Sequence, residues 1–191
     1  MPTKTPVNRA EELMKRRLEE SYDPQSLIAL APIHTDQNVA DIGSGPGWLS
    51  IPLAKYLYGG HLYAVDIQEG MLQKLSERAQ EVRLSNITTV VSKESTIPLD
   101  DGAMDGVVMS DTLNEASRPK SLFKEAARLM RKGGWLAVVE WLPIEGEPLF
   151  GPPAKQRLSL DQVLEMAADQ GLTRSRSRQI GPSHYVVVFR K

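Results

Sequence analysis

Residues 39–47 read Val-Ala-Asp-Ile-Gly-Ser-Gly-Pro-Gly, and this stretch decides the fold class. It begins as a short apolar strand over 38–42 and runs into a turn that contains three glycines. Apolar residues then recur at helical spacing from Trp48 onward, and Pro52 fits the first turn of a helix that starts near residue 48 or 49. A strand that passes through a glycine-rich turn into a helix is typical of parallel α/β sheets, in which ligands bind at the carboxyl ends of the strands.

The same alternation of strands and helices continues along the chain. The hydrophobic pattern predicts further strands at 61–66, 87–91, 104–109 and 135–141, and a last pair at 173–180 and 185–190. A short turn around Gly181-Pro182 joins this pair, so the two strands must be antiparallel, because a parallel pair needs a long crossover. We therefore predict an α/β fold: a doubly wound, mostly parallel seven-stranded sheet with a C-terminal antiparallel strand pair and helices on both faces.

The helices between these strands have their own signals. The helix after the second strand is predicted to bury Leu72, Leu75, Ala79 and Val82. The next helix starts near Pro119 and is expected to stop at Gly133-Gly134. A later one has the capping-box residues Ser159 and Gln162 at its head and is expected to end at Gly171.

The chain length fits one domain, predicted to span residues 1–191. An N-terminal helical cap over 1–31 precedes an α/β core over 38–191. The cap contains a charged helix over 8–21, which is expected either to cover a site as a lid or to be solvated, and a shorter helix over 26–31.

Composition excludes several function classes. The chain has no cysteine, so disulfides, thiolate metal sites and a cysteine nucleophile are excluded, and no metal site is predicted. With a net charge of −1, the chain has no overall excess of basic residues to bind a phosphate backbone, so no nucleic-acid partner is expected. The charged N-terminus is no signal peptide, and no apolar run reaches membrane-spanning length. We expect a cytoplasmic protein without membrane insertion, whose oligomeric state stays open.

The glycine turn and Asp66 together point to an adenosine-containing cofactor. Asp66 ends the second predicted strand, where a carboxylate can accept hydrogen bonds from two ribose hydroxyls. The dinucleotide fingerprint G-x-G-x-x-G would need a glycine at the position of Trp48, and no Lys-Ser or Lys-Thr follows the turn to bind a triphosphate. A cofactor with a ribose but no pyrophosphate remains. S-adenosylmethionine fits, because Asp41 supplies negative charge near its ammonium group and the helix N-terminus favours its carboxylate.

Several segments, in order, resemble class I S-adenosylmethionine-dependent methyltransferases of the small methyltransferase-domain, type 11-like family. They are VADIGSGPG at 39–47, YAVDI at 63–67, IPLDDGAMDGVV at 97–108, LFKEAARLMRKGGWLAVVEW at 122–141, LSLDQVLEMAADQGL at 158–172 and HYVVVFRK at 184–191. The resemblance covers roughly residues 20 to 191 and implies the Rossmann-like methyltransferase fold.

The resemblance also implies a set of cofactor contacts. The residues implied to bind the cofactor are Asp41, Gly43, Ser44, Gly45, Gly47, Asp66, Ile67, Lys93, Glu94 and Ser110. Among them, the glycine turn would line the methionine part, Asp66 would hold the ribose and Ile67 would pack on the adenine. The family often has Gly-Asp after the third strand; this chain has Ser92-Lys93, so either Lys93 or Glu94 takes that place.

Asp111 and Glu115 are the candidate catalytic residues, because they follow the fourth strand, where the cofactor methyl is expected. The alternative for both is a solvated loop and helix cap. His34, His61 and His184 lie in no motif, and a structural role is expected for each. Methyl transfer needs mainly alignment of the acceptor, and a base only where the acceptor must lose a proton.

The predicted function is transfer of a methyl group from S-adenosylmethionine to a small-molecule acceptor, with S-adenosylhomocysteine as the product. One alternative is a non-catalytic S-adenosylmethionine-binding sensor or partner subunit. Another is a nicotinamide-dependent oxidoreductase, which the glycine spacing and Trp48 disfavour.

Overall fold

The computed structural model describes residues 5–20, 22–144 and 151–191. The strands are β1 (Asn38–Ile42), β2 (His61–Asp66), β3 (Ile87–Val91), β4 (Met104–Ser110), β5 (Met130–Trp141), β6 (Thr173–Ile180) and β7 (His184–Arg190). The helices are α1 (Ala10–Glu20), α2 (Pro24–Leu30), α3 (Ser50–Tyr56), α4 (Glu69–Glu81), α5 (Pro119–Leu129) and α6 (Leu160–Ala168), with short 3-10 turns η1 (Val7–Arg9) and η2 (Ala154–Gln156). Parts of the predicted cap over 1–31 lie outside the described residues.

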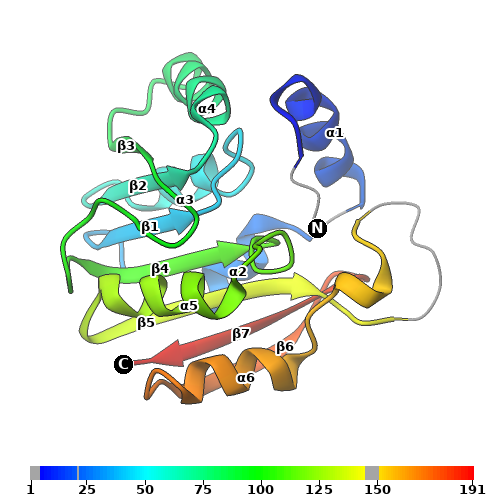
Figure 1. The fold of residues 1–191 in the computed structure, drawn as a ribbon. Coiled ribbons are helices and arrows are strands. Elements are labelled where there is room, and N and C mark those ends of the chain that lie inside the picture. The colour runs from blue at the N-terminus through cyan, green and yellow to red at the C-terminus, as the bar shows by residue number, and fades with distance from the viewer. Residues whose placement is uncertain (1–4, 21, 145–150) are drawn as a thin grey trace.

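The strands form one seven-stranded sheet in the order β3-β2-β1-β4-β5-β7-β6. Neighbours from β3 to β5 are parallel, and β7 is antiparallel to both β5 and β6. In Figure 1 the arrowheads of β1 and β4 point toward the side on which α1 lies, whereas β7 runs the opposite way. The predicted fold class is confirmed.

Apolar side chains fill the space on both faces of the sheet. On one face, α5 and α6 pack through side chains such as Phe123 and Val163, and these two helices lie in front of the sheet in Figure 1. On the other face, α2 and α3 contribute Leu27 and Leu53 to a second buried cluster. Strand β1 lies between β2 and β4, so the order of the strands reverses direction at β1. In sheets of this kind, ligands bind at such a switch point, outside the carboxyl ends of the strands.

Two helix starts follow the predicted signals, whereas α2 begins at Pro24, two residues before the helix predicted over 26–31. Pro52 lies in the first turn of α3, and the capping box of Ser159 and Gln162 is present at the head of α6. The Asp23 side chain caps α2 by accepting a hydrogen bond from the Gln25 backbone N–H. Local hydrogen-bonding rules therefore suffice to place these ends.

Two predicted helix ends were wrong. Val82 is 43% exposed, because α4 has already ended and this residue is its C-cap. Helix α5 ends at Leu129, before Gly133-Gly134, and these glycines lie within β5. The Lys191 ammonium donates hydrogen bonds to the backbone carbonyls of Ala127 and Met130, both at 2.7 Å. These bonds satisfy carbonyl groups at the C-terminal end of α5, so the helix can end before the two glycines.

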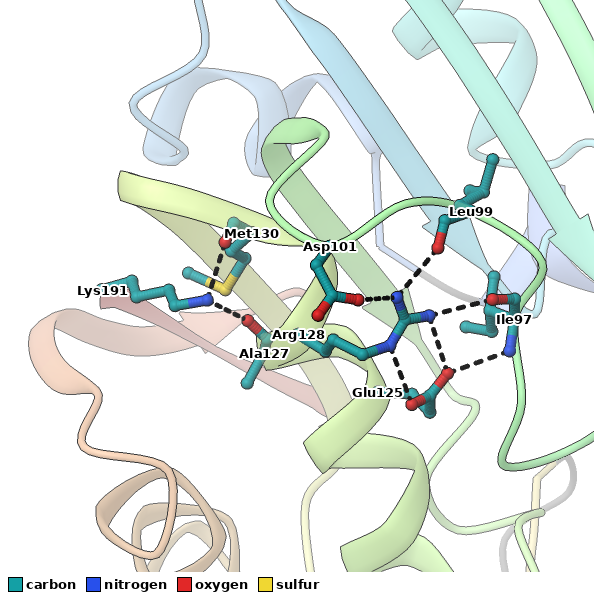
Figure 2. A network of polar contacts seen from close by, with 8 residues as sticks. All are labelled: Ile97, Leu99, Asp101, Glu125, Ala127, Arg128, Met130 and Lys191. Carbon is teal, nitrogen blue, oxygen red and sulfur yellow. Dashed lines mark hydrogen bonds and ion pairs between the residues drawn. The ribbon is translucent and has the colours of Figure 1, made fainter.

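A network of polar contacts around Arg128 ties the loop after β3 to helix α5 (Figure 2). The guanidinium donates to the backbone carbonyls of Ile97 and Leu99 and to the carboxylates of Asp101 and Glu125. Burial is the largest single influence on the Glu125 carboxyl and raises its pKa, but the hydrogen bonds from the Arg128 side chain and the Ile97 backbone N–H, with the positive charge of Arg128, together outweigh it. The pKa of Glu125 therefore lies below its ordinary value. The network fixes the segment that leads into β4.

Among the described residues, no helix combines the length and the apolar character needed to cross a membrane.

Candidate cofactor and substrate site

A pocket opens at the carboxyl ends of β1, β2 and β4, where the switch point predicts a ligand. Its lining includes most of the predicted site residues: Asp41, Gly43, Ser44, Gly45, Asp66, Ile67, Glu94, Ser110, Asp111 and Glu115. Two predicted cofactor residues, Gly47 and Lys93, do not line it. The sequence analysis did not predict Thr5, Leu13, Gln68, Ser92 or Thr112 as site residues, and all of them line the pocket.

The glycine turn between β1 and α3 approaches its neighbours closely. Gly43 has φ +75°, and a Cβ there would lie 2.4 Å from the Thr112 hydroxyl oxygen. Gly45 has φ +52°, but a Cβ there would meet nothing within 4 Å. Gly43 is therefore required for packing, whereas Gly45 leaves open space in front of the turn. Gly47 packs near Leu75, on the helix side of the turn.

Asp66 connects the two turns that flank the pocket. Its carboxylate accepts hydrogen bonds from the backbone N–H groups of Gly45 (2.9 Å) and Gln68 (2.8 Å), and the residue is 7% exposed. A carboxylate held by two backbone donors keeps one orientation and is available to ribose hydroxyls. Asp41, also buried, accepts a hydrogen bond of 2.6 Å from the hydroxyl of Ser50, the first residue of α3.

The loop after β3 presents Glu94, not Lys93, to the pocket. Lys93 is exposed and pairs through its backbone with Thr96. The Glu94 carboxylate lines the pocket and accepts hydrogen bonds from the Ser117 hydroxyl (2.7 Å) and the Arg118 backbone N–H (2.8 Å). Of the two alternatives for this position, the geometry favours Glu94.

Asp111 directly follows β4 in a left-handed conformation, with φ +54°. Its backbone N–H donates to the Val139 carbonyl at 2.9 Å, which fixes the turn against β5. The residue is 6% exposed, so the alternative of a solvated loop does not hold for it. Glu115 lines the same wall, whereas the preceding Asn114 is buried and does not line the pocket.

The structure adds a histidine that the sequence analysis treated as structural. His184 begins β7 and is fully buried, and its Nε2 lies 3.2 Å from Asp111 Oδ1. Its Nδ1 lies 2.9 Å from the Ser183 hydroxyl, and its ring packs against those of Trp141 and Tyr22. The pairing of β7 with β5 sets His184 opposite Trp141, a register that the sequence pattern did not show.

Glu140, near the end of β5, lies beneath the same wall. It is fully buried and accepts a hydrogen bond of 2.9 Å from the Leu113 backbone N–H. Burial raises the pKa of the Glu140 carboxyl well above its ordinary value, and the negative charge of Asp111 raises it further. Burial therefore favours the protonated form of Glu140, and its hydrogen bond with Leu113 fixes the loop that carries the wall.

The N-terminal segment covers part of the pocket. Thr5 and Leu13 are in the lining, and the Gln68 side-chain amide donates to the Thr5 carbonyl at 3.0 Å. The Arg78 guanidinium donates to the Glu11 carboxylate and to the Pro46 carbonyl, so it joins α1, α4 and the glycine turn. Helix α1 contributes to the site and is not merely solvated.

Comparison with known proteins now decides the family. The family model described as a methyltransferase domain matches residues 40–138, which is 99 of the 191 residues. The chain belongs to this methyltransferase-domain family. The matched part runs from β1 to β5 and so contains the glycine turn, Asp66 and the Asp111 turn. The resemblance inferred from the sequence is confirmed.

The relatives of this methyltransferase-domain protein are named for different methyl-transfer reactions. It is 28% identical over 160 residues to the malonyl-[acyl-carrier protein] O-methyltransferase of Hahella chejuensis, which covers 78% of this chain and 55% of that protein. It is 29% identical over 113 residues to the ubiquinone/menaquinone biosynthesis C-methyltransferase UbiE of Roseobacter denitrificans, covering 59% of this chain and 45% of that one. The chain thus spans about half the length of these curated relatives.

Among solved structures, a SAM-dependent methyltransferase from Aquifex aeolicus superposes with a TM-score of 0.89 at 28% identity, covering 98% of this chain and 99% of that one. A Haloferax volcanii methyltransferase, solved in complex with the activator Trm112, has a TM-score of 0.79 at 16% identity and shares the fold, covering 96% of each chain.

Proposed function

We propose that this protein transfers a methyl group from S-adenosylmethionine to a small-molecule acceptor. The observation that carries the proposal is the pocket itself: the glycine turn, the Asp66 carboxylate that it holds and the buried Asp41 lie in one lining, and a side chain at Gly45 would meet no atom within 4 Å. Membership in the methyltransferase-domain family and the likeness to the Aquifex aeolicus enzyme support the same cofactor.

The residues present fit this cofactor group by group. Asp66, held by two backbone donors, would accept hydrogen bonds from the ribose hydroxyls. Asp41 would face the ammonium of the methionine part, and the turn over Gly43 to Gly45 would let the backbone approach it. Ile67, Ser92 and Glu94 also line the pocket and would face the adenine.

When bound, the cofactor supplies an activated methyl group on a sulfonium leaving group. The chain aligns the acceptor behind the methyl and keeps water out, a task for which α1 and the walls of the pocket are placed. Where the acceptor atom carries a proton, Asp111 or Glu115 would take it. Both residues line the pocket after β4, with the Asp111 carboxylate oxygens buried behind its wall.

The pocket favours a small acceptor. Thr5 and Leu13 of the N-terminal segment contribute to its lining, so the site is covered on the side of α1. One relative is named as a malonyl-[acyl-carrier protein] O-methyltransferase and another as a ubiquinone/menaquinone biosynthesis C-methyltransferase, so family membership alone does not identify the acceptor.

Isothermal calorimetry of the purified chain tests the proposal, with S-adenosylmethionine and S-adenosylhomocysteine as ligands and NADH as the control. We expect binding of both sulfur ligands and none of NADH. Asp66→Asn should weaken binding about 10- to 100-fold, because a charged hydrogen bond is worth roughly 1.5–3 kcal/mol. Asp100→Ala, at an exposed loop position, should leave it unchanged. Absence of binding to the wild-type chain would reject the proposal.

Binding alone does not separate an enzyme from a sensor. A screen of small-molecule acceptors with methyl-labelled cofactor supplies that separation, since a methyltransferase yields labelled product together with S-adenosylhomocysteine. Cofactor binding without turnover on any acceptor of the screen would favour the sensor.

A further inference from the structure

Every charged side chain that the structure places in the pocket lining is acidic. These residues are Asp41, Asp66, Glu94, Asp111 and Glu115. Over the described ranges 5–20, 22–144 and 151–191, no lysine, arginine or histidine is in the lining. Charge of one sign along a concave surface focuses the field that a ligand meets inside it. The lining therefore favours a ligand that carries or develops positive charge.

We propose that the methyl acceptor is a small amine, and that Glu115, on the wall after β4, selects it against carboxylates. The inference rests on the proposed function, because it names the class of molecule that would receive the methyl group. The acceptor atom is then a nitrogen with a lone pair, in a compound that is neutral or cationic.

The cofactor would offset only part of the negative charge of the lining. Asp41 would face its ammonium, Asp66 its ribose and Glu94 its adenine. S-adenosylmethionine carries a sulfonium, an ammonium and a carboxylate, so it brings one net positive charge against several carboxyl groups. The wall after β4 therefore still favours a cation once the cofactor is bound.

Glu115 is the acidic residue of this wall to which we assign the effect. The Asp111 carboxylate oxygens are buried, and one of them lies 3.2 Å from His184 Nε2. Glu140 is fully buried, and burial, followed by the negative charges of Asp111 and then of Glu115, raises its pKa. Glu115 itself is half-buried and lines the pocket, so its charge acts on a ligand there.

Trp48 adds an apolar surface that suits a cation better than an anion. It is the aromatic residue of the lining as far as the structure describes it, and it is half-buried. Its indole nitrogen is buried, so the ring can offer only carbon surface to a ligand. The face of a tryptophan ring attracts ammonium groups, whereas a carboxylate gains nothing from it.

Two basic side chains near the pocket are committed elsewhere. The Arg78 guanidinium donates to the Pro46 carbonyl and to the Glu11 carboxylate. Lys93 is exposed in the turn that pairs with Thr96 and does not line the pocket. A carboxylate acceptor would therefore give up its hydration without gaining either of these counter-charges, which is costly.

The movement of charge during the reaction also suits an amine. The nitrogen lone pair forms the bond to the methyl carbon as the carbon–sulfur bond breaks, and the electron pair of that bond stays on sulfur. The positive charge thus passes from sulfur to nitrogen, where Glu115 would stabilise it as it develops. An amine that enters as an ammonium first gives one proton to Glu115 or to water. The products are S-adenosylhomocysteine and an N-methylammonium compound.

Calorimetry with sinefungin tests the charge preference without any acceptor. Sinefungin has an amine-bearing carbon where S-adenosylmethionine has its methylated sulfur, whereas S-adenosylhomocysteine has no charge there. We expect the full chain to bind sinefungin about tenfold more tightly than S-adenosylhomocysteine. Glu115→Gln should lower this ratio about fivefold, and Glu165→Gln, at an exposed position outside the lining, should not change it. A ratio near one, or a ratio that Glu115→Gln leaves unchanged, would overturn the proposal.

The acceptor screen tests the class of molecule directly. Matched sets such as benzylamine, benzyl alcohol and phenylacetate keep the scaffold and change the acceptor group. We expect kcat/KM for the amine to exceed that for the carboxylate about 100-fold, and Glu115→Gln to lower kcat for the amine about tenfold with an unchanged KM for the cofactor. Trp48→Leu should raise the KM for the amine about fivefold. Faster methylation of a carboxylate than of its matched amine would overturn the proposal.

The two proposals fail in different ways. A wild-type chain that binds no S-adenosylmethionine would reject the proposed function. A chain that binds it but takes S-adenosylhomocysteine as tightly as sinefungin would reject only the amine acceptor. Where no scaffold of the screen is methylated, the ratio of the two affinities and its response to Glu115→Gln still decide the inference.

Discussion

The Arg78 guanidinium of α4 donates two hydrogen bonds, of 2.8 and 2.9 Å, to the Glu11 carboxylate of α1. The Glu11 side chain is 74% exposed, so the ion pair contributes little to the free energy of unfolding. It nevertheless joins the helix that carries Leu13 of the pocket lining to the body of the protein. We therefore expect the pair to affect access to the pocket more than stability.

We predict that Glu11→Gln changes the stability by less than about 1 kcal/mol and raises the dissociation rate of S-adenosylmethionine severalfold. Stopped-flow displacement by S-adenosylhomocysteine measures that rate. Lys120→Gln is the matched control, because Lys120 forms an exposed ion pair with Asp169 away from the pocket lining. An unchanged dissociation rate in Glu11→Gln would show that α1 does not retain the ligand.

The buried Glu140 gives the stability a pH dependence of known sign. Its pKa is raised in the folded protein, so its contribution to stability is complete at low pH and is lost as the pH rises from about 4.5 through the folded-state pKa. Glu140→Gln does not titrate and keeps a hydrogen-bonding amide. We predict that the Tm of this variant, relative to wild type, increases as the pH rises above about 4.5. Thermal unfolding at several pH values measures it, with the exposed Glu165→Gln as the control; a difference that stays constant across this range would contradict the prediction.

Two neighbouring glycines should respond differently to the same substitution. Gly43→Ala drives a methyl group into Thr112 in a left-handed conformation, and should cost more than about 2 kcal/mol of stability. Gly45→Ala meets no atom within 4 Å, so only about 1 kcal/mol of backbone strain is expected. The added methyl of Gly45→Ala stands in the pocket, and the variant should fold but bind S-adenosylmethionine at least tenfold more weakly. Chemical denaturation and calorimetry separate the two; equal stability losses would refute the packing argument.

The Arg128 network in Figure 2 predicts a large effect at a position far from the glycine turn. The Arg128 side chain is only 27% exposed, and its removal takes the guanidinium donor from the carbonyls of Ile97 and Leu99. The Glu125 carboxylate would keep only the hydrogen bond from the Ile97 backbone N–H. Arg128→Ala should cost about 2 kcal/mol. Arg131→Ala, at a side chain that is 52% exposed and bound to Asp105, should change stability by about 0.5 kcal/mol or less. Urea unfolding of both variants tests this, and a loss in Arg131→Ala as large as in Arg128→Ala would contradict it.

Strand and helix positions were predictable because they depend on local patterns. The glycine turn, the capping box at Ser159 and the antiparallel end of the sheet all follow from neighbouring residues. The ends of α4 and α5 were misplaced, since Val82 is apolar but exposed and Lys191 closes α5 from the far end of the chain. Long-range contacts of this kind leave no periodic signal in the sequence.

In the candidate site, too, the residues placed by local patterns were predictable and those placed by long-range contacts were not. Asp41, Asp66 and Asp111 lie at strand ends, so the alternation of strands and helices along the sequence was enough to predict that they lie in one site. His184 was missed as a partner of Asp111 because their contact depends on the register between β5 and β7 and on the left-handed turn after β4. Lys93 was predicted from its position in a motif, but its side chain is exposed in a turn.

The left-handed backbone at Asp111 also determines which substitutions can be interpreted there. At φ +54°, aspartate and asparagine are tolerated because their short polar side chains bond locally, whereas alanine costs about 1–2 kcal/mol in the same conformation. An alanine scan would therefore score this position as essential for two unrelated reasons, one conformational and one chemical. Mutational surveys of related sequences should find aspartate, asparagine and glycine here, and the asparagine members would reveal which relatives dispense with the carboxylate.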